Sequence, residues 1–138
     1  MKTKILTSVL ATFMLLFVSC TGNSQTKKTI AKTKATTATI EIIQFHSEHR
    51  CMTCNKIEKL TRETLKEFKA IPFSLVNVDD AKNEKKAEQF EATGTALFLY
   101  NPKTGKKKDL TDFAFMNAGD EAKFKKELKK EIQLFLKA

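Results

Sequence analysis

The cysteines at positions 51 and 54 stand where an apolar, β-branched segment gives way to an amphipathic one. Residues 39–46 have the composition of a buried strand, and residues 51–69 place apolar side chains at helical spacing. A thiol at the start of a helix faces unpaired backbone N–H groups and the positive end of the helix dipole, which favours the thiolate. A second thiol one turn later can resolve a mixed disulfide. The spacing therefore predicts dithiol–disulfide exchange, with Cys51 as nucleophile and Cys54 as resolving thiol.

The third cysteine, Cys20, follows a positively charged start and an apolar run. Lys2 and Lys4 precede the run at residues 5–18, which is shorter than a membrane-spanning helix requires. We therefore expect residues 1–19 to be a signal peptide. The sequence Leu-Phe-Val-Ser-Cys that ends at Cys20 resembles a bacterial lipobox, and this resemblance implies lipidation of Cys20. Ordinary cleavage nearby and an uncleaved anchor are the alternatives.

Residues 20–37 are rich in Thr, Lys, Ser and Ala, and we expect them to form a flexible tether. The remaining residues, 38–138, are numerous enough for one domain with its own core. An exported dithiol drifts to the disulfide, so a reductive role requires a membrane electron donor. The residues after Cys20 lack the acidic run that resembles a surface-export signal in Bacteroidetes-type lipoproteins. We expect a lipid-anchored, periplasm-facing protein of the cell envelope.

The formal charge is +9 and falls to +7 without the first nineteen residues. Nucleic acid is not expected as a partner of an exported protein. The charge could hold the domain near anionic lipid, but solvated helix and strand surfaces are the simpler interpretation. We apply the same interpretation to the lysines at residues 106–108.

The domain alternates between strand and helix patterns. An Asn-Pro-Lys-Thr-Gly turn signal at residues 101–105 separates the last two strands. The strands are predicted at residues 39–46, 73–78, 95–100 and 107–111, and the helices at residues 51–69, 82–93 and 120–137. This order predicts an α/β fold with a mixed sheet covered by helices, and places the cysteines at the carboxyl end of the first strand. Phe113, Phe115 and Met116 are predicted to be core, with a partner-docking patch as the alternative.

This element order, with a CxxC motif opening the first helix, resembles the thioredoxin-like superfamily over nearly all of residues 38–138. The match includes residues 76–79, residues 94–100 and Gly105 in the hairpin. The resemblance implies a thioredoxin-like fold and exchange with a protein thiol or disulfide partner, and we expect no cofactor. A thiol–disulfide oxidoreductase is thus one interpretation of the chain.

Three positions depart from the thioredoxin pattern. Thr95 stands where thioredoxins have a cis-proline, and because cis bonds at other residues are costly we expect a trans junction there. Gln44 replaces a buried acid, and Arg50 replaces the tryptophan before the first cysteine. Loss of the proline disfavours broad oxidative folding, so a reductase is favoured, and it could open the site to metal.

The two histidines of the chain stand beside the cysteines. His49 and Arg50 are expected to stabilise the Cys51 thiolate, while His46 caps or bonds a loop. Alternatively, His46, His49, Cys51 and Cys54 form a tetrahedral site for zinc or copper(I), which would make the chain a metal-binding or metallochaperone module. A catalytically silent domain with a structural disulfide is the third class.

Glu58 follows Cys54 by one helical turn. We expect it to form a surface ion pair with Arg62 at i,i+4. The alternative is that it assists proton transfer from the Cys54 thiol.

Overall fold

The computed structural model describes residues 40–138. The predicted signal peptide, Cys20 and the predicted tether lie outside these residues, as do the first two residues of the predicted domain. The described chain forms one four-stranded sheet in the order β2-β1-β3-β4. The strands are β1 (Glu41–His46), β2 (Phe73–Asn77), β3 (Ala96–Tyr100) and β4 (Lys107–Asp109), and the helices are α1 (Met52–Thr64), α2 (Glu84–Phe90), α3 (Thr111–Asn117) and α4 (Glu121–Lys137).

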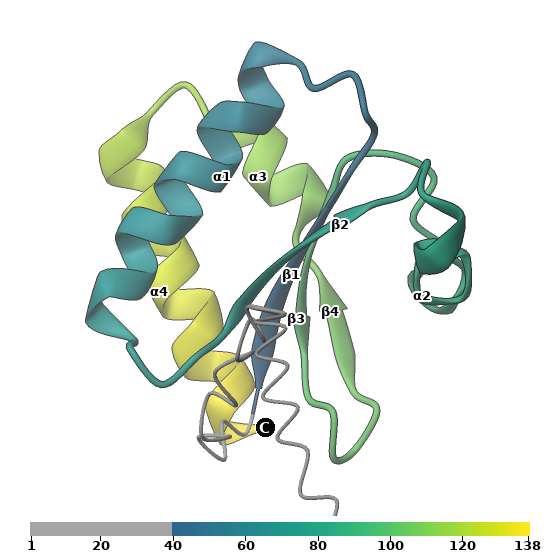
Figure 1. Cartoon of the computed structure of the whole chain (residues 1–138). Helices are drawn as coiled ribbons and strands as arrows, with labels where there is room; N and C mark the ends of the chain where they lie inside the picture. The colour runs from purple at the N-terminus through teal and green to yellow at the C-terminus, as the bar shows by residue number, and fades with distance from the viewer. Residues whose placement is uncertain (1–39) are drawn as a thin grey trace, which may run out of the picture. The chain divides into compact units, whose positions relative to one another are not determined.

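The sheet is mixed, as the sequence predicted. β1 runs parallel to β2 and antiparallel to β3, and β4 pairs antiparallel with β3. Helices α1, α3 and α4 cover one face, and α2 covers the other (Figure 1). A βαβ unit followed by an antiparallel hairpin and a final helix is the thioredoxin-like arrangement, so the predicted α/β thioredoxin-like fold is confirmed.

The central strand β1 supplies side chains to both layers because successive residues of a strand point to opposite faces. Ile42 packs with α1 and α4, whereas Ile43 and Phe45 pack with Phe90 of α2. Gln44 shares the Ile42 face and is fully buried. The strand thus carries its one internal polar side chain to the face that also receives the first turn of α1.

Helix α4 follows its predicted apolar stripe. The four residues of that stripe are all buried: Phe124, Leu128, Ile132 and Phe135. Asp120 begins the helix as an N-cap, with its side chain accepting a hydrogen bond from the Lys123 N–H at 2.9 Å. Burial at a spacing of three and four residues makes this helix predictable from sequence.

Helix α3 was not predicted, and the strand expected at residues 107–111 ends at Asp109. Asp109 accepts a hydrogen bond from the Thr111 N–H at 2.7 Å, which turns the chain out of the sheet. The core interpretation of two α3 residues was wrong: Phe115 is 42% exposed and Met116 is 83% exposed. Phe113 does pack against the core. The alternation of phenylalanines imitates a strand, while the buried residues recur every fourth position at Leu110, Ala114 and Ala118.

Candidate redox site

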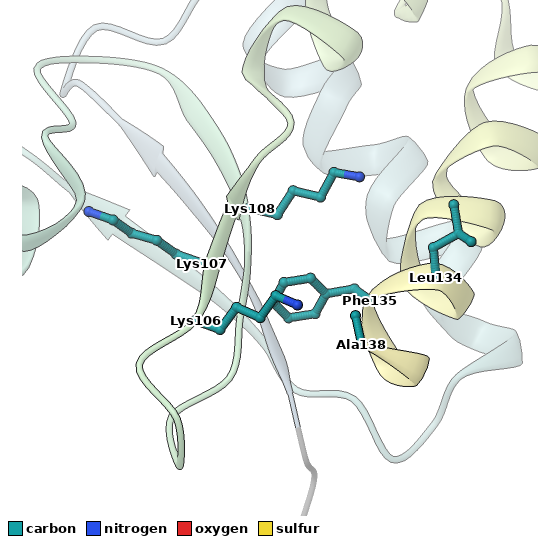
Figure 2. A pocket seen from close by; sticks show the side chains of 6 residues that line it. All are labelled: Lys106, Lys107, Lys108, Leu134, Phe135 and Ala138. Carbon is teal, nitrogen blue, oxygen red and sulfur yellow. The ribbon is translucent and has the colours of Figure 1, made fainter.

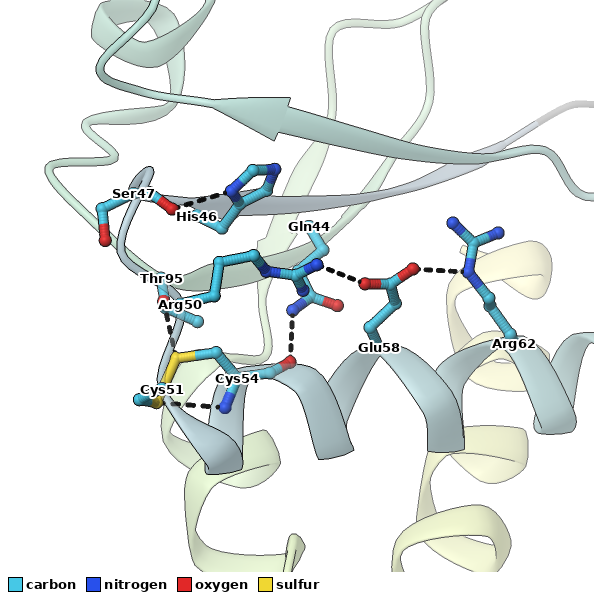
Figure 3. Close-up of polar contacts among 9 residues, drawn as sticks. All are labelled: Gln44, His46, Ser47, Arg50, Cys51, Cys54, Glu58, Arg62 and Thr95. Atoms are coloured by element: carbon cyan, nitrogen blue, oxygen red, sulfur yellow. Dashed lines mark hydrogen bonds and ion pairs between the residues drawn. A yellow bond between two sulfur atoms is a disulfide. The ribbon is translucent and has the colours of Figure 1, made fainter.

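The two cysteines lie at the start of α1, just beyond the carboxyl end of β1, and form a disulfide in this structure (Figure 3). Cys51 is the N-cap residue of the helix, and its Sγ accepts a hydrogen bond from the Cys54 N–H at 3.1 Å. This N–H is one of the donors that a helix leaves unpaired at its first turn. The helix end therefore offers a hydrogen-bond donor and a positive dipole to negative charge on this sulfur.

The two sulfurs differ in their access to solvent. Cys51 is exposed, whereas Cys54 is 5% exposed. The Cys54 Sγ lies 3.1 Å from the Thr95 Oγ1. Thr95 directly precedes β3, and the pairing of Ala96 with Phe45 brings it to the same edge of the sheet as the cysteines. The predicted supporting residue Thr95 thus contacts the inner sulfur, and an external disulfide has access to Cys51 first.

The Gln44 side chain links strand β1 to the first turn of α1. Its Nε2 donates a hydrogen bond to the Cys54 carbonyl oxygen at 3.0 Å. The Oε1 of the same amide is buried and has no hydrogen-bond partner among residues 40–138. The sequence indicated only that an acid was replaced at this position. The amide instead links the central strand to the backbone of the inner cysteine.

Arg50 points along α1 toward Glu58, and its Nη1 lies 2.6 Å from the Glu58 Oε2 (Figure 3). The other Glu58 oxygen accepts from the Arg62 Nε at 2.7 Å, which confirms the predicted i,i+4 pair. Arg50 was expected to support the Cys51 thiolate, but in this oxidised structure its charge is directed to Glu58. Its Nε and Nη2 are buried and have no partner in the described part of the chain.

The pKa of Glu58 is lower than its ordinary value. Partial burial raises this pKa, but the hydrogen bonds and charges of Arg62 and Arg50 together outweigh burial. The lowered pKa makes this carboxylate a weaker proton acceptor, and its two oxygens are bonded to Arg50 and Arg62. This disfavours the proton-transfer interpretation of Glu58.

The two histidines do not join the cysteines in a ligand set. The His46 Nδ1 lies 2.9 Å from the Ser47 carbonyl oxygen, so this nitrogen is the protonated donor of a loop hydrogen bond. His49 is exposed, and the contact recorded for it is through its backbone carbonyl, which accepts from the Ser47 hydroxyl at 3.2 Å. Within residues 40–138, no three His, Cys, Asp or Glu side chains are gathered to hold a metal ion. The metal-binding alternative thus gains no support from the described residues.

A shallow hollow of about 230 Å³ lies beside the first turns of α1. It is lined by Met52, Thr53, Lys56, Phe115, Ala118 and Gly119. Met52, the first of the two residues between the cysteines, is 88% exposed. Sequence reasoning did not find this hollow, because its far wall belongs to the unpredicted helix α3.

From residue 40 onward, the structure has no helix of the length and apolar character needed to cross a bilayer. No family model and no curated protein matches the sequence. Among solved structures, the chain is similar to thioredoxin O2 from Arabidopsis thaliana in its oxidised state, with 15% identity, a TM-score of 0.43 and coverage of 52% of this chain and 61% of that one. It is also similar to Chlamydomonas reinhardtii thioredoxin f2, with 21% identity, a TM-score of 0.44 and coverage of 61% and 82%. A malarial protein matches with 23% identity, a TM-score of 0.41 and coverage of 57% and 94%.

Proposed function

We propose that the protein exchanges its Cys51–Cys54 dithiol with a disulfide of a partner protein. The observation that carries this proposal is the asymmetry of the pair. Cys51 is exposed and receives a backbone N–H at the helix end, while Cys54 is buried against Thr95. A purely structural disulfide has no need of one exposed sulfur at a helix N-terminus.

The exchange runs in two displacement steps. The Cys51 thiolate attacks one sulfur of the partner disulfide, forms a mixed disulfide and expels the other partner sulfur as a thiolate. The Cys54 thiolate then attacks the Cys51 sulfur and expels the second partner thiolate. Two electrons pass to the partner, the protein is left as the disulfide seen here, and the partner thiolates take up protons according to pH.

The partner binds where Cys51 is reached from solvent. The hollow between Met52 and Phe115 accepts an apolar residue near the partner cysteine. Thr95 lies at the inner sulfur instead of the proline that thioredoxins place there, which supports a narrow choice of partner rather than broad oxidative folding. We therefore propose the reductive direction, with electrons supplied by a membrane donor.

The proposed location is the periplasmic side of the cell envelope, with the chain anchored by a lipid on Cys20. The support is the charged start, the apolar run and the lipobox-like residues before Cys20. A tether at residues 20–37 would leave the domain free to meet partners near the membrane.

The exchange is tested by reacting the reduced chain with oxidised glutathione and following each thiol by mass spectrometry. Cys54→Ser should accumulate a glutathione adduct on Cys51, whereas the wild-type chain should resolve this adduct to the internal disulfide. Cys51→Ser should react at least about tenfold more slowly, because its remaining thiol is buried. Equilibration of the wild-type pair with glutathione gives its reduction potential, expected below roughly −200 mV for a reductase.

Cys20→Ser is the matched control for the loss of a cysteine away from the site, and it should react as the wild type does. Faster labelling of Cys54 than of Cys51 would reverse the assigned roles. A reduced wild-type pair that does not pass its electrons to oxidised glutathione in the folded chain would refute the exchange function.

A further inference from the structure

The end of the sheet opposite the cysteines carries a basic groove (Figure 2). Lys106 and Lys108 extend from the start of β4 toward the last turn of α4, where Leu134, Phe135 and Ala138 complete a hollow of about 320 Å³. The Lys106 Nζ lies 5.6 Å from the centre of the Phe135 ring. The groove thus has an apolar floor and a cationic rim.

The lysines at the groove end of the sheet differ in whether their charge is paired with a carboxylate. Lys108 forms an ion pair with Glu131, and Lys107 points to the other face, where its amine donates to the Gln89 carbonyl at 2.6 Å. Lys103 and Lys106 are exposed, and no carboxylate lies within ion-pair distance of either amine in the part of the chain from residue 40 on. The groove therefore retains positive charge for an external anion.

Exposed leucines accompany these lysines. Leu134 is 50% exposed and Leu136 is 45% exposed, both on the last turn of α4. Lysines interspersed with exposed apolar side chains are the composition of surfaces that lie in the headgroup region of a bilayer, with amines on phosphates and apolar groups below them.

Strand register shows which end of the domain this is. Glu41 at the start of β1 pairs with Tyr100, and Tyr100 pairs with Lys107. Residue 40, where the described chain begins, therefore lies at the same sheet end as the basic groove. The cysteines follow the opposite end of the same strand.

We propose that this basic groove docks the domain on an anionic lipid surface, with the disulfide facing away from the bilayer. The groove supplies charge complementary to lipid phosphates, and its exposed Leu134 supplies apolar contact. The inference goes beyond the proposed exchange function and depends on the proposed anchor only for raising the local lipid concentration. Lys106, interpreted from sequence as part of a solvated lysine run, thereby gains a ligand.

The test is lysine footprinting on the full chain. The chain is prepared with its own N-terminus and mixed with vesicles of phosphatidylcholine alone or with about one third phosphatidylglycerol. Acetylation of Lys103 and Lys106, followed by mass spectrometry, should slow by about tenfold on the anionic vesicles. Salt at about 0.5 M should remove most of this protection, because it screens exposed charges.

Lys82 and Lys123 serve as internal controls because both lie toward the cysteine end. Lys82 forms an ion pair with Asp80, and the neighbouring Asp79 accepts a hydrogen bond from the Glu48 N–H in the loop before the cysteines. Lys123 lies in the first turn of α4, close in sequence to Gly119, which lines the apolar hollow. Both should react equally on the two kinds of vesicle. In the double variant Lys103→Gln/Lys106→Gln, protection of Lys137 on anionic vesicles should fall, whereas Lys82→Gln/Lys123→Gln, with the same change in charge, should leave it intact.

Equal acetylation of Lys103 and Lys106 on both kinds of vesicle would overturn the inference, as would equal protection of the control lysines. Retention of the chain on neutral vesicles reports the anchor separately, so the two proposals fail independently. If neutral vesicles do not retain the chain, excess anionic vesicles must retain it through the groove alone, and failure to do so refutes the docking.

Discussion

Thr95 and Gln44 hold the inner cysteine from two sides. The Thr95 hydroxyl contacts the Cys54 sulfur, and the Gln44 amide holds the Cys54 carbonyl. Neither side chain is ionisable, so neither carries a proton to or from the thiol as an acid would. Their chemistry is positional: they fix the sulfur and its backbone so that only Cys51 faces solvent.

Thr95→Val tests the contribution of this hydroxyl. Valine keeps the shape of threonine but removes the group that lies 3.1 Å from the Cys54 Sγ. In the reduced protein the hydroxyl can donate to the sulfur, and hydrogen bonds to charged groups contribute about 1.5–3 kcal/mol. We expect the reduction potential to become more negative by about 30 mV, equivalent to about 1.4 kcal/mol, in equilibrium with glutathione.

Thr104→Val is the control for this measurement, since Thr104 is exposed in the hairpin between β3 and β4, at the opposite end of the sheet from the cysteines. Its potential should stay near that of the wild type. A potential for Thr95→Val that is unchanged or more positive would show that the hydroxyl does not favour the reduced state.

At the scale of elements, an ion pair joins the loop after β1 to helix α1. Arg50 lies in the loop, Glu58 lies two turns into the helix region, and their side chains are 22% and 18% exposed. Arg62 adds a second contact from the next turn. The three side chains clamp the loop that presents Cys51 onto the body of the helix.

Glu58→Gln should lower the free energy of unfolding by about 1 kcal/mol near pH 7, a value discounted for partial solvent screening. The variant leaves Arg50 without its anionic partner. Because the folded-state pKa of Glu58 lies below the ordinary 4.5, its contribution is fully present above pH 4.5 and disappears as pH falls through the folded value. Urea unfolding at neutral and strongly acid pH should therefore give a difference that shrinks in acid.

Glu67→Gln removes a comparable carboxylate from a more exposed pair with Lys129, in which the Glu67 side chain is 62% exposed. We expect a loss of less than about 0.5 kcal/mol for this control. A Glu58→Gln loss no larger than this, or one that persists undiminished in acid, would contradict the clamp.

The sequence predicted well those elements whose apolar residues follow one simple pattern. β1 has continuous apolar character, and α4 has its stripe, so both were found within two residues. Helix α3 was missed because Phe113 and Phe115 alternate like strand residues. The cysteines and Thr95 were predictable from motif and element order. The hydrogen bond of Gln44 to α1 and the ion pair of Arg50 with Glu58 could not be predicted, because each depends on how far a side chain extends from one element to the next.

At the scale of the whole molecule, the domain has a redox end and a basic end joined by β1. A strand of six residues spans about 20 Å. Docking through the groove would therefore hold the disulfide at a fixed height above the lipid surface. The proposed anchor confines the domain to the membrane, and the proposed groove orients it.

Cys20→Ser tests the anchor. If lipidation holds the protein, this variant should leave the membrane fraction in a wash of about 0.5 M salt, which also releases the proposed contact between the groove and anionic lipid. Fractionation and the mass of the mature N-terminus provide the measurement. Cys54→Ser should remain with the membrane, and an unchanged distribution of Cys20→Ser would refute lipid anchoring.

The central place of β1 also fixes the order in which the protein can fold. β1 is the first strand of the described chain, yet its two neighbours end only at Asn77 and Tyr100. A chain that emerges N-terminus first, from a ribosome or a translocation channel, exposes the apolar side chains of β1 before either neighbour exists, and such unpaired strands aggregate readily. The Cys51–Cys54 bond spans a single helical turn and needs neither neighbour. The disulfide can therefore close on a nascent chain whose sheet is still open.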